Sequence, residues 1–135
     1  MTFYFITYFL LDTLLDIFSK NTRSCVYRQP GVLAVLILHH LMSCFLLGGW
    51  LFDYVPILIV HILVVIGTTI YWCRNQNLCD LTVYVNKRCG WNPNKPFHDL
   101  LDMVGLKGLP SWNERGHYIF ILLGAAISLY KILKL

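Results

Sequence analysis

Three histidines lie within apolar segments, where an ionisable side chain is a candidate for function. His39, His40 and His61 could ligate a haem iron or a metal ion if their imidazoles met across two helices. His40 lies about 12 residues and His61 about 5 residues from the intervening turn, an offset of roughly 10 Å at the rise of an α-helix. That offset disfavours a shared ligand. We therefore predict interhelical hydrogen bonds, to Ser43, Thr68 or a backbone carbonyl.

The cysteines are the other reactive groups, and no C-x-x-C pair occurs among them. They are Cys25, Cys44, Cys73, Cys79 and Cys89. Cys73, Cys79 and Cys89 could be considered with His98 as zinc ligands, but their spacing lacks the short paired intervals of structural zinc sites. Their odd number and a predicted cytosolic location favour free thiols. No hydrolase, phosphate-loop or dinucleotide fingerprint occurs, so no catalytic residue, cofactor or bound metal is predicted, and an enzyme is disfavoured.

The composition indicates a membrane environment for these groups. Hydrophobic residues make up 57 % of the 135 residues, charged residues make up 13 %, and the mean hydropathy is +0.60. Soluble domains carry about 25 % charged residues. The chain therefore has too little polar surface to cover a water-soluble globule.

The apolar residues cluster into segments long enough to cross a bilayer. Residues 31–52 and 56–73 contain no charged side chain, residues 117–133 contain only Lys131, and residues 2–18 contain Asp12 and Asp16. The sequence thus predicts an all-α integral membrane bundle of three to four transmembrane helices, in a single domain of residues 1–135. A tight turn before Pro56 predicts that the two uncharged spans form an antiparallel hairpin.

The first segment has two open interpretations. Asp12, Asp16 and Lys20 follow one another at intervals of four, so they would share one face of a helix continuing past residue 18. Lys20 could then extend its ammonium group into the interface. This segment either crosses the bilayer or lies along its surface.

The basic residues predict the orientation of the chain. If all four segments cross, nine basic residues lie on the side of the polar loop 74–116 and only Lys131 and Lys134 lie opposite. The loop is therefore expected on the cytosolic face. The basic residues are scattered, so no nucleic-acid-binding surface is predicted.

The polar loop is expected to contain two short amphipathic helices, over residues 80–89 and 96–104. The apolar face of the second, together with two basic residues of the first, is the predicted partner contact. These residues are Phe97, Leu100, Leu101, Val104, Lys87 and Arg88.

One string in the sequence carries a family resemblance. After His61 and Trp72, the chain has the pattern Asn-x-Asn-x-Cys-x-Leu-Thr, formed by Asn75, Asn77, Cys79, Leu81 and Thr82. It resembles small multi-span membrane proteins encoded by large double-stranded-DNA viruses. This chain departs from their pattern because Tyr71 replaces a histidine before the tryptophan, and no acidic residue follows Thr82.

The resemblance implies a structural protein: either a component of a virion internal membrane that derives from host endomembrane, or a minor capsid component. Its expected partners are the lipid bilayer and other capsid or membrane proteins, with a possible oligomer. Without the resemblance, the string describes a turn in which asparagine side chains bond the backbone and Asp80 or Thr82 caps the next helix. Two alternatives stay open: a membrane redox, metal or haem protein using the histidines, and a small oligomeric channel using Asp12 and Asp16.

Overall fold

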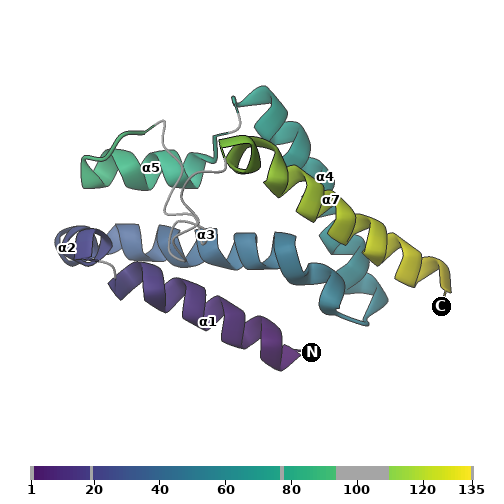
Figure 1. Cartoon of the computed structure of the whole chain (residues 1–135). Coiled ribbons are helices and arrows are strands. Elements are labelled where there is room, and N and C mark those ends of the chain that lie inside the picture. Colours follow the sequence, from purple (N-terminus) through teal and green to yellow (C-terminus); the bar gives the residue numbers. More distant parts are fainter. Residues whose placement is uncertain (1, 19, 77, 94–109, 135) are drawn as a thin grey trace.

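The computed structural model describes residues 2–18, 20–76, 78–93 and 110–134, and these residues contain helices and turns without a strand (Figure 1). The prediction of an all-α chain is confirmed for this part. The elements are α1 (Thr2–Phe18), α2 (Lys20–Arg28), α3 (Pro30–Gly48), η1 (Gly49–Leu51), α4 (Val55–Arg74), α5 (Asp80–Cys89) and α7 (Pro110–Lys134).

Two stretches are long and apolar enough to cross a membrane. They are Gly31–Leu51, with a mean hydropathy of 2.0, and Val55–Arg74, with a mean hydropathy of 2.1. They coincide with the two uncharged segments of the sequence. Only 28 % and 17 % of these stretches are buried inside the molecule, so most of their apolar surface faces outward.

Helix α1 places its polar residues inward and its apolar residues outward. Asp12, Thr13 and Asp16 are buried, whereas Leu11 and Leu15 are more than half exposed. Helix α7 repeats this arrangement, with a buried Ser128 among exposed apolar side chains. Water would favour the opposite arrangement, because exposed apolar surface is costly there.

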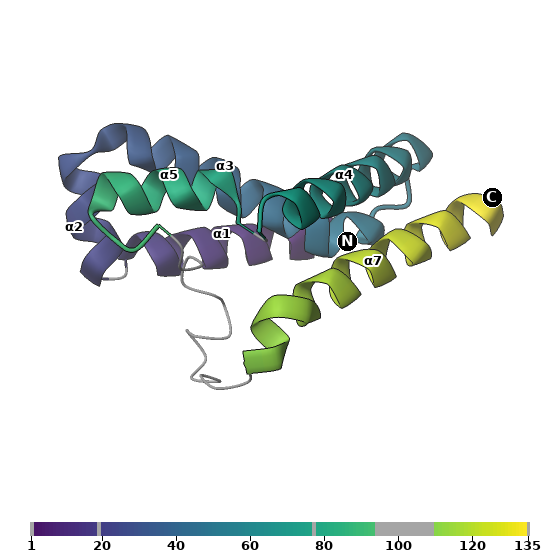
Figure 2. The same cartoon turned by 90° about the horizontal axis from the view of Figure 1, so that it is seen from above.

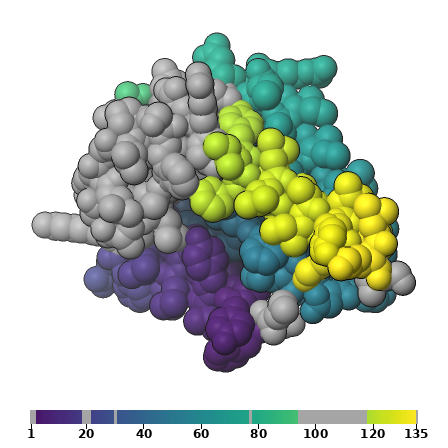
Figure 3. All heavy atoms as spheres, turned by 45° about the vertical axis from the view of Figure 1, so that its right-hand side comes forward, coloured from purple at the N-terminus to yellow at the C-terminus, as the bar shows by residue number. Residues whose placement is uncertain are grey.

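The long helix α3 lies between α1 on one side and α5 on the other, as two perpendicular views agree (Figures 1 and 2). Beside it, α4 packs most extensively against α7, which runs across the surface of the molecule (Figure 3). Lys131 of α7 reaches back to the turn after η1, where its Nζ lies 2.7 Å from Asp53 Oδ1. This ion pair joins the C-terminal helix to the α3–α4 connection.

The helices α3 and α4 form a looser hairpin than the sequence suggested. They meet at η1 and then diverge, leaving a hollow of about 270 Å³ between them. The last carbonyls of α3 lack helical partners, and the indole Nε1 of Trp50 donates to Leu47 O at 2.7 Å. Pro56 lies in the first turn of α4 as expected, because that position needs no N–H donor.

The boundaries of other helices both confirm and correct the predictions. Helix α5 covers residues 80–89 as predicted and ends at Gly90, whose φ of 71° lies in the left-handed region that glycine tolerates. Helix α1 ends at Phe18, so the prediction that Lys20 continues the face of Asp12 and Asp16 is wrong. Lys20 instead begins α2, a short helix that the sequence analysis did not predict.

Candidate functional site

The most concentrated polar chemistry lies where α1 crosses α3. Imidazole Nδ1 of His40 lies 2.7 Å from Asp12 Oδ2, and its Nε2 lies 3.0 Å from Asp16 Oδ2. The Thr22 hydroxyl of α2 donates to the other oxygen of Asp16 at 3.2 Å. We call these residues the Asp–His–Asp cluster. Asp16 and Thr22 are fully buried, so each carboxylate is compensated by partners rather than by water.

The four-residue spacing of the two aspartates explains the geometry. Residues four apart lie on the same face of a helix, so Asp12 and Asp16 point toward α3 together. His40 presents both ring nitrogens to them. The channel alternative would require the aspartates to line an open face of α1, but both are buried against α3.

A second buried histidine joins α4 to two neighbours. Imidazole Nε2 of His61 lies 3.1 Å from Leu46 O, and its Nδ1 lies 2.8 Å from Ser128 Oγ. A carbonyl only accepts, so Nε2 donates, and in a neutral imidazole Nδ1 then accepts from the Ser128 hydroxyl. Leu46 belongs to the last turn of α3, where carbonyls lack helical partners. The predicted bond to a backbone carbonyl is confirmed for His61, while Ser43 and Thr68 are not its partners.

Two glycines leave the space that the His61 ring occupies. A Cβ built at Gly49 would lie 2.3 Å from His61 Cδ2, and one built at Gly124 would lie 3.4 Å from His61 Cε1. The Gly124 Cβ would also lie 2.8 Å from Trp50 Cδ1. Gly49 is therefore required for close approach of the backbone to the imidazole, and Gly124 for close approach to the Trp50 indole.

The haem or metal alternative finds little room in this arrangement. His40 and His61 each use both ring nitrogens in bonds to the protein. Ligation through either would break at least one of these bonds. Within the part of the chain that the structure describes, no group of three or more His, Cys, Asp or Glu side chains could hold a metal ion.

The ring of His39 lies 5.7 Å from that of His40, but its side chain lines the hollow between α3 and α4. Its Nδ1 is 3.8 Å from the thiol of Cys79, the N-cap residue of α5. The hollow is lined by residues of three helices and of the Cys79 turn. Sequence analysis did not predict this contact, since the two residues are forty positions apart and meet through the packing of α5 against α3.

The asparagine string forms the predicted turn. The Asn75 amide donates to Leu78 O at 2.9 Å and to Asp80 Oδ1 at 3.2 Å, and Gln76 has a positive φ of 53°. The helix cap differs from the prediction, because Cys79 is the N-cap of α5 and no side chain bonds there. Thr82 is buried within α5 and Leu81 is half-buried, so both face its packing surface. Asn77 lies outside the described residues.

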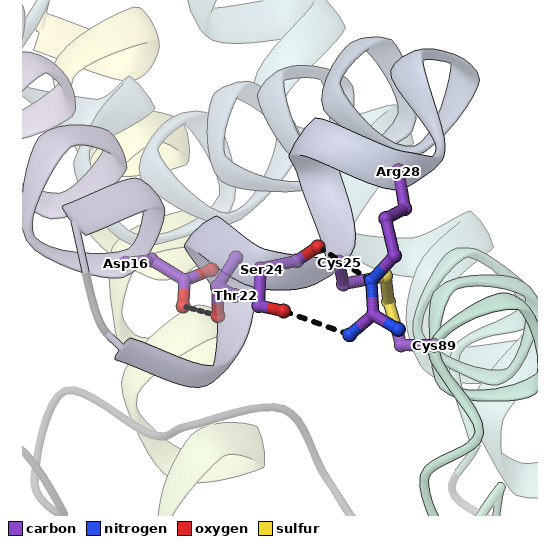
Figure 4. Close-up of a disulfide and its surroundings, with 6 residues drawn as sticks. All are labelled: Asp16, Thr22, Ser24, Cys25, Arg28 and Cys89. Atoms are coloured by element: carbon purple, nitrogen blue, oxygen red, sulfur yellow. Dashed lines mark hydrogen bonds between the residues drawn. A yellow bond between two sulfur atoms is a disulfide. The ribbon is translucent and has the colours of Figure 1, made fainter.

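Two cysteines form a disulfide, which corrects the prediction of free thiols. Cys25 of α2 is bonded to Cys89 of α5 across a sequence separation of 64 residues (Figure 4). The bond borders an apolar cluster of Val32, Leu36 and Val85. Sequence spacing did not reveal the pair, because α2 and α5 are far apart in the chain and come into contact where both pack against α3. Cys44, Cys73 and Cys79 are free.

The bond also removes Cys89 as a thiolate ligand, and His98 lies outside the described residues.

Part of the predicted partner surface can be located. Lys87 and Arg88 are exposed on α5, where the guanidinium of Arg88 lies 5.5 Å from the ring centre of Tyr84. The four apolar members fall outside the described residues; they are Phe97, Leu100, Leu101 and Val104.

Comparison with known proteins gives no relative from which a role could be transferred. No family model, curated protein or solved structure matches this chain.

Proposed function

We propose that this chain is a structural membrane protein whose helices form a bundle crossing the bilayer and hold a polar segment at one face. Its setting would be the internal membrane of a virion, where it anchors or scaffolds the shell. The viral setting depends on the resemblance at residues 75–82. The structural role depends on the contacts of the buried histidines.

The observation that carries the structural role is the use of polar side chains to join helices. His40 connects α3 to α1, and His61 connects α4 to both α3 and α7. In lipid, such bonds hold helices together where the hydrophobic effect does not. The exposed apolar sides of α1 and α7 support two further crossings beside the two apolar stretches of α3 and α4.

Two observations about the polar side of the molecule point to different cellular compartments, and a virion is compatible with both. The basic residues favour a cytosolic position for the segment after α4, whereas the Cys25–Cys89 disulfide favours an oxidising environment. A particle that is assembled in the cytosol and then released would meet both requirements in turn. The bond would form after insertion.

The test is incorporation of the protein into particles. The double variant Lys87→Glu, Arg88→Glu reverses two exposed charges on α5, and Lys134→Glu reverses an exposed charge at the far end of α7. We expect the α5 variant to insert into membranes normally and to be depleted from particles, while the α7 variant is incorporated like the wild type. Normal incorporation of both, or a visible haem spectrum or stoichiometric metal in the purified protein, would contradict the proposal.

A further inference from the structure

A continuous chain of hydrogen bonds runs from α2 along the interface between α1 and α3. It passes from Thr22 to Asp16, from Asp16 to His40 and from His40 to Asp12. The side chains of Asp12, His40 and Asp16 are 11 %, 6 % and 0 % exposed, so exposure decreases along the chain from Asp12 to Asp16. Ionisable groups this deep between membrane helices usually have a role in proton movement or in ion binding.

The number of protons in the cluster follows from its geometry. An ionised carboxylate only accepts hydrogen bonds, so a hydrogen must lie between each ring nitrogen of His40 and its aspartate. The hydrogens are either both on the imidazole, or one is on the imidazole and one on a carboxyl group. Both arrangements hold two protons and carry a net charge of minus one.

The separated groups hold fewer protons. Above about pH 6.5, an imidazole in water has one ring hydrogen and both carboxylates are ionised. Bringing α1 onto α3 therefore takes up one proton. We propose that the Asp–His–Asp cluster is a proton-binding site, and that the bound proton links the docking of α1 to acidity.

The neighbours of the cluster bear on this linkage. Among the described side chains, the titratable groups facing it are His39, with its ring centre 5.7 Å from that of His40, and Cys44, a buried thiol one turn after His40 on α3. Helix α2 contributes the uncharged hydroxyl of Thr22. No Lys or Arg side chain among these neighbours could balance the second carboxylate in place of a proton. The second proton of the cluster, on the imidazole or on a carboxyl group, must therefore come from solution.

The attachment of α1 depends heavily on these bonds. Neither apolar cluster of buried residues among the described part of the chain includes an α1 residue. Phe5, whose ring centre lies 5.3 Å from that of Phe52, adds an aromatic contact near the other end of α1. Because one proton is taken up, the docking constant should fall tenfold for each pH unit above about pH 6.5, until the docked cluster itself loses the proton. Below that pH the attachment is fully present.

The first test reads the proton directly in the wild-type protein. ¹⁵N-histidine NMR and infrared spectroscopy in lipid nanodiscs at about pH 7.5 should show either two protonated nitrogens on His40, or one together with a protonated carboxyl group. His61 is an internal control, since one protonated nitrogen is enough for its bonds to Leu46 O and Ser128 Oγ. A bare nitrogen on His40 without a protonated carboxyl group would overturn the proposal.

The second test measures the linkage. Hydrogen exchange of α1, corrected for intrinsic rates, should show an opening constant that rises tenfold per pH unit above about pH 6.5 in the wild type. The double variant Asp12→Asn, Asp16→Asn should lose this dependence, and Asp80→Asn, an exposed carboxylate outside the cluster, should keep it. A wild-type opening constant that does not change with pH would exclude the linkage, even if the double variant fails to fold.

Discussion

At the scale of single residues, the two buried histidines of this protein are hydrogen-bonded to other helices, whereas the buried Thr13 hydroxyl has no partner among the described residues. His40 is placed between two carboxylates, and His61 between a carbonyl and a hydroxyl. A hydrogen bond of this kind between membrane helices contributes about 0.6 kcal/mol, and at most about 1.7 kcal/mol. Their combined effect is mainly to fix which helix faces meet, because a shifted helix would leave a buried group without its partner.

Close packing around His61 gives a prediction at this scale. Gly49 has ordinary helical dihedral angles, so Gly49→Ala changes only the space available, and its Cβ would lie 2.3 Å from the imidazole. We expect the free energy of unfolding to fall by about 1 to 3 kcal/mol, as for other overpacked sites. Reversible denaturation in mixed micelles measures the change.

Gly67→Ala is the matched control, because nothing lies within 4 Å of a Cβ at that position of α4. It should leave stability unchanged or raise it by about 0.4 to 1 kcal/mol. An equal loss for both variants would show that the space beside His61 is not the cause.

At the scale of helices, α5 is attached by a covalent bond as well as by packing. Val85 is fully buried against α2 and α3, and Cys89 closes the same corner through its bond to Cys25. The rest of α5 is short and partly exposed, so packing alone gives it limited stability. The disulfide therefore holds the amphipathic helix along α3.

Replacing both partners tests this attachment without creating a new free thiol. The double variant Cys25→Ser, Cys89→Ser should lose about 2 to 4 kcal/mol of stability, the usual contribution of a disulfide. Amide exchange within α5 should become faster, since the helix can then leave α3. Cys73→Ser, at an exposed free thiol, should behave like the wild type. Unchanged exchange in the double variant would mean that packing alone holds α5.

At the scale of the whole molecule, apolar surface faces outward and polar contacts lie inside. Asp16, His61 and Ser128 are fully buried, whereas Leu63 and Leu133 are among the most exposed residues. This distribution is suited to lipid, which solvates apolar side chains and offers no partner to polar ones. It supports a membrane location more directly than the hydropathy of two helices alone.

The proposed maturation in a particle gives a prediction for the intact protein. Cys25 and Cys89 should be reduced in newly made, cell-associated protein and paired in released particles. Quenching with a maleimide reagent, followed by non-reducing electrophoresis, measures the fraction paired in each pool. A bond already complete in new protein would instead place this side of the membrane in an oxidising compartment from the start.

The sequence by itself determined the helical class, the two long apolar helices and the helix over residues 80–89. These features depend on local patterns: apolar length, the spacing of apolar residues, Pro56 at a helix start and Gly90 at a helix end. Hydrogen bonding within a helix joins residues only a few positions apart, so a short window of sequence contains the information. The same locality explains why the Asn75 turn was recognisable.

Only the tertiary structure decided which polar groups meet. The pairing of His40 with Asp12, of His61 with Ser128 and of Cys25 with Cys89 joins residues that are 28, 67 and 64 positions apart. Each residue type has several possible partners in the chain, and spacing does not choose among them. The choice depends on how the helices pack, because the glycine at position 49 leaves room for His61 and the polar face of α1 turns Asp12 and Asp16 toward His40. In an apolar medium, a packing that separated these groups would leave them without partners.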